Sequence, residues 1–416
     1  MRPLRVLMSA YACEPRKGSE PGLGWNWALQ MARWHDMTVI TRRNNRKAIE
    51  AEVNGESAKI RFVYVDPPRW LSFWKRGQRG IYLYYLLWQI FAYREAAALC
   101  RHSDFDILHH VTFGNVWMPS FLPLLKGAFI FGPVGGCERV PVALRSTFSL
   151  RGRLIERVRD GLLIWTRFLD PWVRFTMSRA DLVIARTRIT QDALRHMCSG
   201  KCEVMLETGI SQELLDELGS EGSGKGREPV VLMVGRFLHW KGMNLGIEAF
   251  LRLSARFPNA RLLILGVGPE EQRLKARAEL GNGCIEFLGQ RPREEALELM
   301  RSSSALLVPS MKDGGTWVIY EAMACELPVV CVDYAGPAEL VADGCGIKIP
   351  VATPEEVVAG LAAGLERLLD DPAVGRQVAA RAKAYLAERY LWESLGEQMN
   401  RYYTRVIGER GVEGSV

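Results

Sequence analysis

The sequence predicts an α/β protein with two doubly wound domains. Short apolar segments that fit buried strands alternate with helical segments along the whole chain, a pattern that places helices on both faces of a mostly parallel sheet. A length of 416 residues favours two such domains, and residues 218–229, rich in Gly and Ser, are the best linker. We therefore expect domains over residues 1–215 and 216–387, with the active site in a cleft between them.

The expected elements follow from apolar periodicity. Strands are expected at residues 5–10, 37–41, 61–65, 107–111, 128–131 and 182–185, then at 230–234, 261–265, 285–287, 305–308, 329–332 and 346–349. Helices of the first domain are expected near residues 21–33, 82–101, 117–125 and 191–197. The apolar residues 6–10 superficially resemble a signal peptide, but the loop and amphipathic helix that follow at once favour a first strand.

Composition fits a globular protein of a reducing compartment. Hydrophobic residues make up 48% and charged residues 24% of the chain, as in ordinary globular domains. The nine cysteines form no paired framework. His196, Cys198 and Cys202 are close in sequence but lack a fourth ligand, so loop thiols are favoured over a zinc site. The longest apolar run, residues 81–93, is too short to span a membrane.

Charge is divided unequally along the chain. Residues 1–200 contain 30 Lys and Arg against 16 Asp and Glu, whereas residues 201–416 contain 24 against 31. The basic half is expected to face a polyanion or an anionic membrane. No nucleic-acid motif accompanies it, and Trp and Tyr interleave with the basic residues, so an anionic membrane surface is expected rather than nucleic acid. The alternative is a core helix at residues 81–93 with the arginines on a solvated face.

A glycine turn between a strand and a helix carries the strongest signal of a binding site. The expected strand 305–308 is followed by Asp313, Gly314, Gly315 and Thr316, and then by a helix that contains Glu321. The free N–H groups and positive dipole end at such a helix start bind phosphate. Both carboxylates can face a ligand that lies on the helix start.

A second loop of this type follows the expected strand 230–234. Gly235 and Arg236 open it and Lys241 closes it; arginine offers phosphate a planar fork and lysine a mobile point charge. The two loops together predict a pocket for a nucleotide sugar. The alternatives are a solvated charged turn for the two cations, and an acid favoured only by the helix dipole for Glu321.

With these motifs the chain resembles the retaining glycosyltransferases of the GT-B fold, in the GT4 family. Asp313 and Glu321 match the family's E-x7-E motif, and landmarks at residues 17–20, 106–110, 235–242, 265–269, 287–289 and 390–393 occur in the family's order. The resemblance covers nearly the whole chain. It implies two Rossmann-like domains that face a central cleft, with a terminal helix, residues 388–416, that crosses back onto the first domain.

The resemblance also implies roles for the site residues. Glu321 is expected to contact the ribose hydroxyls and Asp313 the hydroxyls of the donor sugar. Arg236, Lys241 and the helix start neutralise the diphosphate, so no metal or other cofactor is expected, and Gly18 lets its loop approach the diphosphate. Where this chain has Asp313, the family usually has Glu, followed by Pro-Phe-Gly. The family commonly has Gly at the position of Glu326, and it usually has Asn at the position of Thr208. These departures leave the donor sugar open.

The first domain holds weaker candidates. His109 and His110 end an expected strand and match the family's sugar-contacting histidine, but neighbours on a strand face opposite sides, and a structural histidine is the alternative for each. Asp104 and Asp106 spell the D-x-D of metal-dependent transferases, yet they precede a strand rather than follow one, so no metal is expected there. A candidate acceptor-side wall, or a mere loop, is formed by Gly135, Gly136 and Glu138.

We therefore expect a retaining transferase that moves a sugar from a nucleotide sugar to an acceptor hydroxyl, by front-face attack in which the leaving phosphate takes the acceptor's proton. The expected acceptor is a saccharide or a lipid-linked oligosaccharide of bacterial surface-polysaccharide synthesis. The expected location is the cytoplasm or the inner face of the cytoplasmic membrane. The alternatives are a GT-B epimerase or phosphorylase, or a catalytically silent subunit that binds nucleotide sugars.

Overall fold

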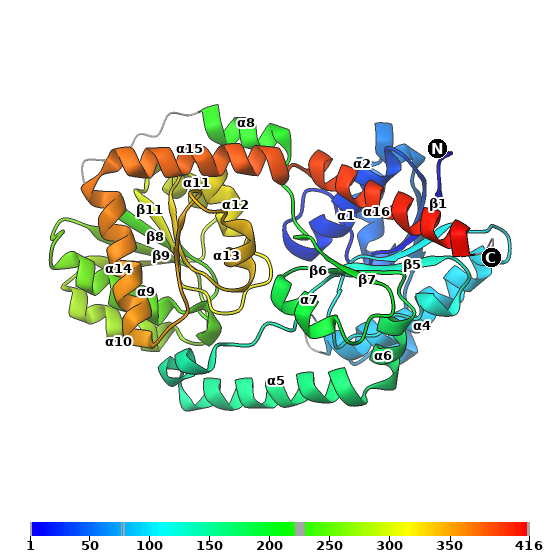
Figure 1. Cartoon of the computed structure of the whole chain (residues 1–416), viewed down its shortest axis with the longest axis horizontal. Coiled ribbons are helices and arrows are strands. Elements are labelled where there is room, and N and C mark those ends of the chain that lie inside the picture. Colours follow the sequence, from blue (N-terminus) through cyan, green and yellow to red (C-terminus); the bar gives the residue numbers. More distant parts are fainter. Residues whose placement is uncertain (1, 76, 78–79, 221–228, 414–416) are drawn as a thin grey trace. The chain divides into compact units, whose positions relative to one another are not determined.

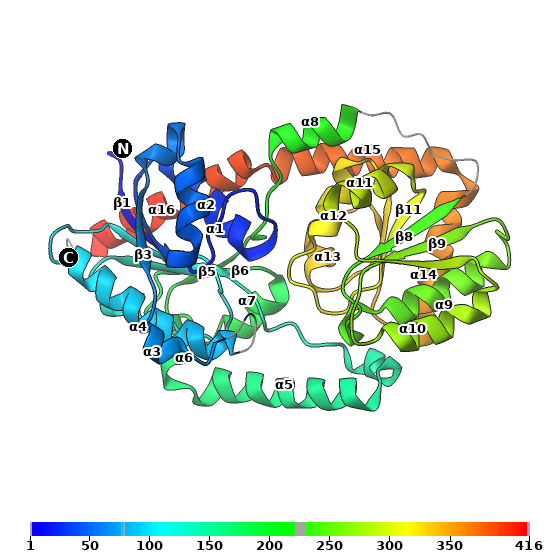
Figure 2. The same cartoon turned by 180° about the vertical axis from the view of Figure 1, so that it is seen from behind.

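The computed structural model describes residues 2–75, 77, 80–220 and 229–413 and forms two compact units. Figures 1 and 2 show the chain from opposite sides. The first unit comprises Met1–Cys137, Leu162–Glu207 and Trp392–Val416, and the second comprises Glu138–Gly161 and Thr208–Leu391. Each unit is described by itself below.

The division differs from the expected one because the segment Glu138–Gly161 belongs to the second unit. Val140, Leu144 and Phe148 are buried in the core of that unit, and apolar burial of this kind outweighs order along the chain. Of the expected linker, residues 218–220 end helix α8 (Gln212–Ser220), and residues 221–228 lie outside the described part of the chain.

The first unit is built on seven parallel strands in the order β3-β2-β1-β4-β5-β6-β7. They are β1 (Arg5–Ser9), β2 (Asp36–Arg42), β3 (Arg61–Val65), β4 (Ile107–His110), β5 (Ala128–Val134), β6 (Leu182–Ala185) and β7 (Lys201–Val204). The central strands are buried on both faces, as parallel strands under two helix layers are. The edge strand β7 has no apolar run and was not expected.

Helices cover both faces of this sheet. They are α1 (Ser19–Ala32), α2 (Arg46–Glu52), α3 (Arg69–Ser72), α4 (Ile81–Cys100), α6 (Pro171–Ser178), α7 (Arg188–Leu194) and α16 (Trp392–Glu413), and α5 (Leu150–Leu169) belongs to this unit from Leu162 onward. In both views α1 and α16 lie on one face and α4 and α6 on the other (Figures 1 and 2). Tyr85 and Trp88 are fully buried, so the apolar run at residues 81–93 begins a core helix.

The helix expected at residues 117–125 is wrong. Only a 3₁₀ turn, η3 (Leu122–Leu124), forms there. Pro119 and Pro123 remove two backbone donors from this stretch, and proline inside a helix also clashes with the preceding turn. The other short 3₁₀ turns are η1 (Arg43–Asn45), η2 (Gly55–Lys59), η4 (Val142–Thr147), η5 (His239–Lys241) and η6 (Glu279–Gly281).

The second unit is built on six parallel strands in the order β10-β9-β8-β11-β12-β13. They are β8 (Val230–Val234), β9 (Arg261–Leu265), β10 (Ile285–Gly289), β11 (Ala305–Val308), β12 (Val329–Val332) and β13 (Ile347–Ile349). The order reverses between β8 and β11, so the loops that leave these two strands lie at the switch point where α/β sheets bind ligands.

The remaining helices of this unit are α9 (Met243–Ser254), α10 (Glu271–Ala278), α11 (Arg293–Ser302), α12 (Trp317–Ala324), α13 (Ala335–Leu340), α14 (Pro354–Asp370) and α15 (Pro372–Arg389). Both views show α9, α10 and α14 on one face of the sheet and α11 and α12 on the other (Figures 1 and 2). Thr353 starts α14 with a capping box: its hydroxyl accepts from the Glu356 N–H, and the Glu356 carboxylate accepts from the Thr353 N–H. No helix in the described residues is both long and apolar enough to cross a bilayer.

Candidate functional site

The two loops singled out by sequence meet at the switch point of the second sheet. The first loop, Gly235–Gly242, leaves β8, and the second, Ser310–Thr316, leaves β11. Gly242 has φ +64°, and a Cβ atom there would lie 2.1 Å from the Pro309 carbonyl oxygen. Only glycine combines that conformation with so close an approach. We call these two segments the donor loops.

Direct bonds join the donor loops at neighbouring residues. The Met311 N–H donates to the Trp240 carbonyl oxygen at 2.9 Å. Next to it, Lys241 Nζ donates to Asp313 Oδ2 at 2.7 Å, and both side chains are largely buried. The structure therefore brings together two of the expected site residues, one cation and one carboxylate.

The turn before α12 is held by backbone contacts. The Gly336 N–H donates to the Asp313 carbonyl oxygen at 2.6 Å, and a Cβ atom at 336 would lie 2.8 Å from the Gly314 carbonyl oxygen. Gly314, Gly315 and Thr316 precede the first residue of α12, Trp317, as expected of a helix start that can take an anion.

Two buried hydroxyls flank this turn. Ser310 Oγ and Thr316 Oγ1 are buried and have no hydrogen-bond partner among the described residues. Because an unpaired buried polar group costs free energy, both are suited to bond a polar ligand at the helix start.

Glu321 lies on α12 and is paired with a residue that sequence reasoning missed. Arg293 Nε, at the start of α11, donates to Glu321 Oε1 at 2.8 Å. Only its position at a helix start after β10 could have singled Arg293 out. Arg236 lies at the exposed entrance of the first donor loop, with no carboxylate partner among the described residues.

In the first unit, the expected glycine loop is bound by an arginine. Arg186 follows β6 and contacts Glu20 Oε1 at 3.2 Å and Glu207 Oε2 at 2.7 Å. The other oxygen of Glu20 accepts from the Phe113 N–H at 3.0 Å. A side chain at Gly18 would meet open space, and its φ of −79° is one that any residue adopts. Gly18 therefore leaves the loop open, but the turn itself does not require glycine there.

Both histidines are buried and hydrogen-bonded, which favours the structural alternative over the expected catalytic or sugar-contacting role. His109 contacts the Tyr403 hydroxyl at 2.6 Å and the Gly132 carbonyl oxygen at 2.8 Å. His110 contacts the Tyr85 hydroxyl at 2.8 Å and the Ser120 hydroxyl at 3.0 Å. Both rings are buried under helices on opposite faces of the sheet, and every ring nitrogen has a partner. Burial lowers the pKa of His109 to about 4 and that of His110 to about 3, so both are neutral at pH 7.

The acceptor-side candidates are divided between the units. Gly135 and Gly136 belong to the first unit and Glu138 to the second. Gly136 has φ +110°, a conformation that favours glycine, and a Cβ atom at Gly135 would lie 2.9 Å from Arg186 Cδ. Glu138 is buried and has partners of its own.

In the D-x-D segment, Asp106 makes hydrogen bonds that hold two strands of the first sheet together. Asp106 accepts from the Arg5 N–H at 2.7 Å and from Arg2 Nη2 at 2.9 Å, so it fixes the start of β4 against β1. Within the described residues, no three His, Cys, Asp or Glu side chains are grouped as a metal site would need. All nine cysteines are free.

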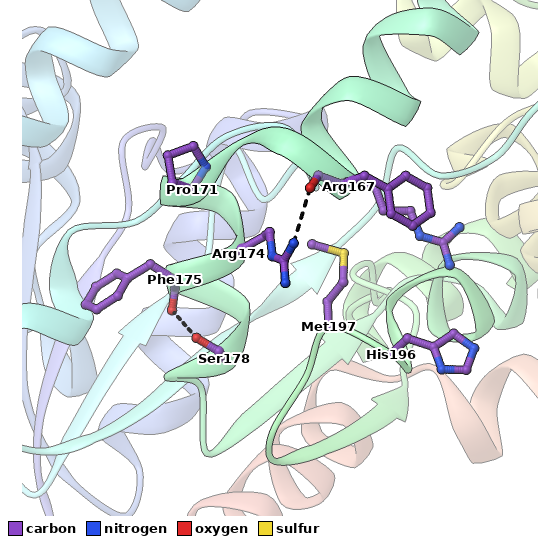
Figure 3. A pocket seen from close by; sticks show the side chains of 8 residues that line it. Arg167, Pro171, Arg174, Phe175, Ser178, His196 and Met197 are labelled. Carbon is purple, nitrogen blue, oxygen red and sulfur yellow. Dashed lines mark hydrogen bonds between the residues drawn. The ribbon is translucent and has the colours of Figure 1, made fainter.

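A cavity of about 520 Å³ in the first unit lies beside α6 (Figure 3). Its lining consists of Arg167, Phe168, Pro171, Arg174, Phe175, Ser178, His196 and Met197. Arg174 Nη1 donates to the Phe168 carbonyl oxygen at 3.2 Å, which holds the guanidinium at the turn from α5 to α6. None of these lining residues is acidic, so the cavity suits an anion with an apolar part.

Known proteins share sequence with the second unit and with most of the chain. Residues 219–388 match the family model described as glycosyl transferases group 1. The chain is 32% identical over 321 residues to a phosphatidyl-myo-inositol mannosyltransferase of Mycobacterium tuberculosis. That alignment covers 76% of this chain and 78% of the mannosyltransferase. The chain is also 26% identical over 250 residues to an uncharacterized glycosyltransferase of Methanocaldococcus jannaschii, which covers 58% of this chain and 62% of that protein.

Among solved structures, sucrose-phosphate synthase of Thermosynechococcus elongatus matches with a TM-score of 0.64 and 18% identity, over 98% of this chain and all of that one. At this identity the likeness shows the fold alone. The two parallel α/β units are those of the GT-B fold.

Proposed function

Because the chain belongs to the glycosyl transferases group 1 family, it is a glycosyltransferase, and we propose that its second unit binds a nucleotide-sugar donor between the donor loops and the start of α12. The observation that carries this proposal is the contact of the two donor loops at the switch point, where Lys241 and Asp313 meet at 2.7 Å. A cation for phosphate and a carboxylate for sugar hydroxyls are thereby placed side by side.

The proposed chemistry uses the charges of the protein alone. As the sugar–phosphate bond breaks, negative charge develops on the leaving diphosphate. Arg236, Lys241 and the N–H groups at Gly314, Gly315 and Thr316 stabilise that charge in this scheme. No divalent metal ion is then needed.

Ligand binding requires the ion pairs of the free protein to rearrange. In the proposal, Lys241 turns from Asp313 to the diphosphate, and Asp313 turns to hydroxyls of the donor sugar. Glu321 keeps Arg293 on one carboxylate oxygen and accepts the ribose hydroxyls on the other. The sugar is transferred with retention of configuration, and the leaving phosphate oxygen takes the proton of the acceptor hydroxyl.

We further propose that the acceptor is a lipid-linked saccharide at the inner face of an anionic membrane. The support is a stripe of apolar residues on α5 at helical spacing, all of which are exposed: Leu150, Leu154, Val158, Leu162, Trp165 and Leu169. Arg151 and Arg157 flank the stripe, and the basic cavity at α6 lies where it ends (Figure 3). Such a helix can lie in the interface of a bilayer, with the cavity able to take a lipid phosphate.

A thermal-shift screen against UDP, GDP and ADP sugars tests the donor proposal. A ligand at 100 times its dissociation constant stabilises the folded protein by about 2.7 kcal/mol. We expect one nucleotide to stabilise the wild type and to have much less effect on Lys241→Ala. The matched control is Arg252→Ala, which removes an exposed cation on α9 of the same unit. No stabilisation by any nucleotide would contradict the proposal.

A further inference from the structure

A fully buried carboxylate lies behind the donor loops. Glu156, on α5, is 0% exposed. Its oxygens accept from Lys312 Nζ at 2.9 and 2.7 Å, and Oε1 lies 3.1 Å from His239 Nε2. The side chains of Lys312 and His239 are 3% and 7% exposed. Neither the sequence motifs nor the comparisons single out this triad.

The two partners of Glu156 belong to different donor loops. His239 lies two residues before Lys241 in the first loop, and Lys312 directly precedes Asp313 in the second. Glu156 therefore adds a third link beside the Trp240–Met311 hydrogen bond and the Lys241–Asp313 ion pair. Unlike those two links, it comes from the segment Glu138–Gly161, which is remote in sequence from both loops.

Close packing leaves the triad little freedom to rearrange. A Cβ atom at Gly152 of α5 would lie 3.2 Å from His239 Cγ, and the Phe148 ring meets the His239 ring edge-on at 4.9 Å between centroids. Lys312 Nζ lies over the Trp240 ring, 5.3 Å from its centroid. The side chains that Glu156 joins are thus fixed from several sides.

We propose that Glu156 is a positioning residue of the donor site, which sets the spacing of the two donor loops through His239 and Lys312 and so places Lys241 against Asp313. For its effect on ligand binding the inference rests on the proposed function; its effect on the loops themselves does not. Stability alone is a weak reason to bury an ion pair, because apolar residues of similar volume often stabilise a fold equally well. Directional bonds to two loops give a reason that apolar residues cannot supply.

Two variants and one control separate positioning from stability. Glu156→Gln removes the charge with little change of volume. Glu156→Leu combined with Lys312→Met replaces the pair by apolar side chains and leaves no buried charge unpaired. The control is Asp160→Asn, on the same helix, whose ion pairs are with Arg145 and Arg139 and whose charge acts on Lys312 without direct contact.

Two measurements apply to each variant. Amide hydrogen exchange of the free protein is followed in peptides that cover residues 236–243 and 310–317. The dissociation constants of UDP, GDP and ADP are measured by calorimetry at matched thermal stability.

We expect the double variant to melt near the wild type and to exchange faster in both donor loops and nowhere else in the second unit. We expect it to bind nucleotide about 10–100-fold more weakly, the size of loss seen when a group that orients the ligands of a metal ion is removed. Asp160→Asn should leave both loops unchanged. Wild-type exchange and wild-type affinity in the double variant would overturn the proposal. If the wild type binds none of the three nucleotides, the proposed function fails. Hydrogen exchange in the donor loops alone then tests whether Glu156 positions them. If the double variant does not fold, Glu156→Gln is compared with Asp160→Asn in the same way.

Discussion

At the scale of single residues, sequence motifs identified the donor loops better than the residues that support them. The structure places Lys241 beside Asp313 at 2.7 Å, although 72 residues separate them in the chain. The sequence left the role of the histidines open because the partners that occupy the rings, such as Tyr403 and Tyr85, lie on helices far away in sequence. Glu156 and Arg293 were missed for the same reason, since each is distinguished only by a distant partner.

The buried hydrogen bonds of His110 predict a loss of stability without a loss of donor binding. In His110→Ala, the hydroxyls of Tyr85 and Ser120 lose the ring and keep only their bonds to Gln89 Nε2 and to the Leu122 N–H inside the first unit. Each hydrogen bond lost inside the fold costs about 0.5–1.5 kcal/mol. Urea unfolding should show that loss, whereas nucleotide affinity of the folded variant should stay at the wild-type value. If His110→Ala kept the stability of the wild type but lost nucleotide affinity, His110 would be a residue of the binding site.

The ion pair of Glu156 predicts a stability that depends on acid. The contacts with His239 and Lys312 outweigh burial and lower the pKa of Glu156 from 4.5 to about 2. A folded-state pKa below the unfolded value means that the contribution is complete above about pH 4.5 and is lost as the pH falls toward 2. Urea midpoints should therefore fall more steeply between pH 5 and pH 3 in the wild type than in Glu156→Leu/Lys312→Met. Parallel curves would contradict this assignment.

At the scale of elements, buried apolar strands were predictable and exposed helices were not. Eleven of the expected strands lie within about two residues of observed ones at both ends because buried runs such as Val230–Val234 have a clear pattern. Helix α5 was not expected from the sequence. Its apolar residues are exposed and alternate with basic and aromatic residues, so residues 150–169 do not show the pattern of a helix that packs on a core. The segment Glu138–Gly161 shows the same limit, since its packing depends on a core formed by residues 231–368.

The exposed stripe of α5 predicts binding to anionic vesicles. Changing Arg151, Arg157, Arg167 and Arg174 to Ser should weaken co-sedimentation with vesicles that contain phosphatidylglycerol, on the order of 1,000-fold at low salt, because each arginine contributes about 1 kcal/mol near an anionic surface. Arg153 and Arg159 are kept because their contacts hold residues of the second unit: Arg153 donates to the Ser146 and Phe148 carbonyls, and Arg159 packs over Trp240.

The control for charge alone is the equal change of Arg43, Arg46, Arg101 and Arg195, exposed arginines elsewhere in the first unit. If both sets of substitutions weaken vesicle binding equally, the net charge of the protein, and not the stripe on α5, explains the binding. Indifference of the wild type to lipid charge would sink the membrane proposal, and a protein partner would then be the better occupant of the stripe.

At the scale of the whole molecule, the two halves of the chain differ in charge as well as in sequence signal. Residues 1–200 carry the basic excess, with 30 Lys and Arg against 16 Asp and Glu, and the family model matches only residues 219–388. The sequence therefore offers site motifs in the second unit and describes the first unit mainly as a fold. Acceptor recognition has no comparable motif, and the proposal for it rests on the surface of α5 and α6.

The most direct test of the central claim is calorimetric titration of the nucleotide selected by the thermal-shift screen, in EDTA, into the wild type and into Arg236→Ala, Lys241→Ala and Glu321→Ala. We predict that the wild type binds fully without metal and that each variant, while folded, binds at least about tenfold more weakly, since each loses a charge-assisted contact of about 1.5–3 kcal/mol. Binding that appears only with Mn²⁺ or Mg²⁺, or that all three substitutions leave unchanged, would contradict a metal-independent donor site between these two loops.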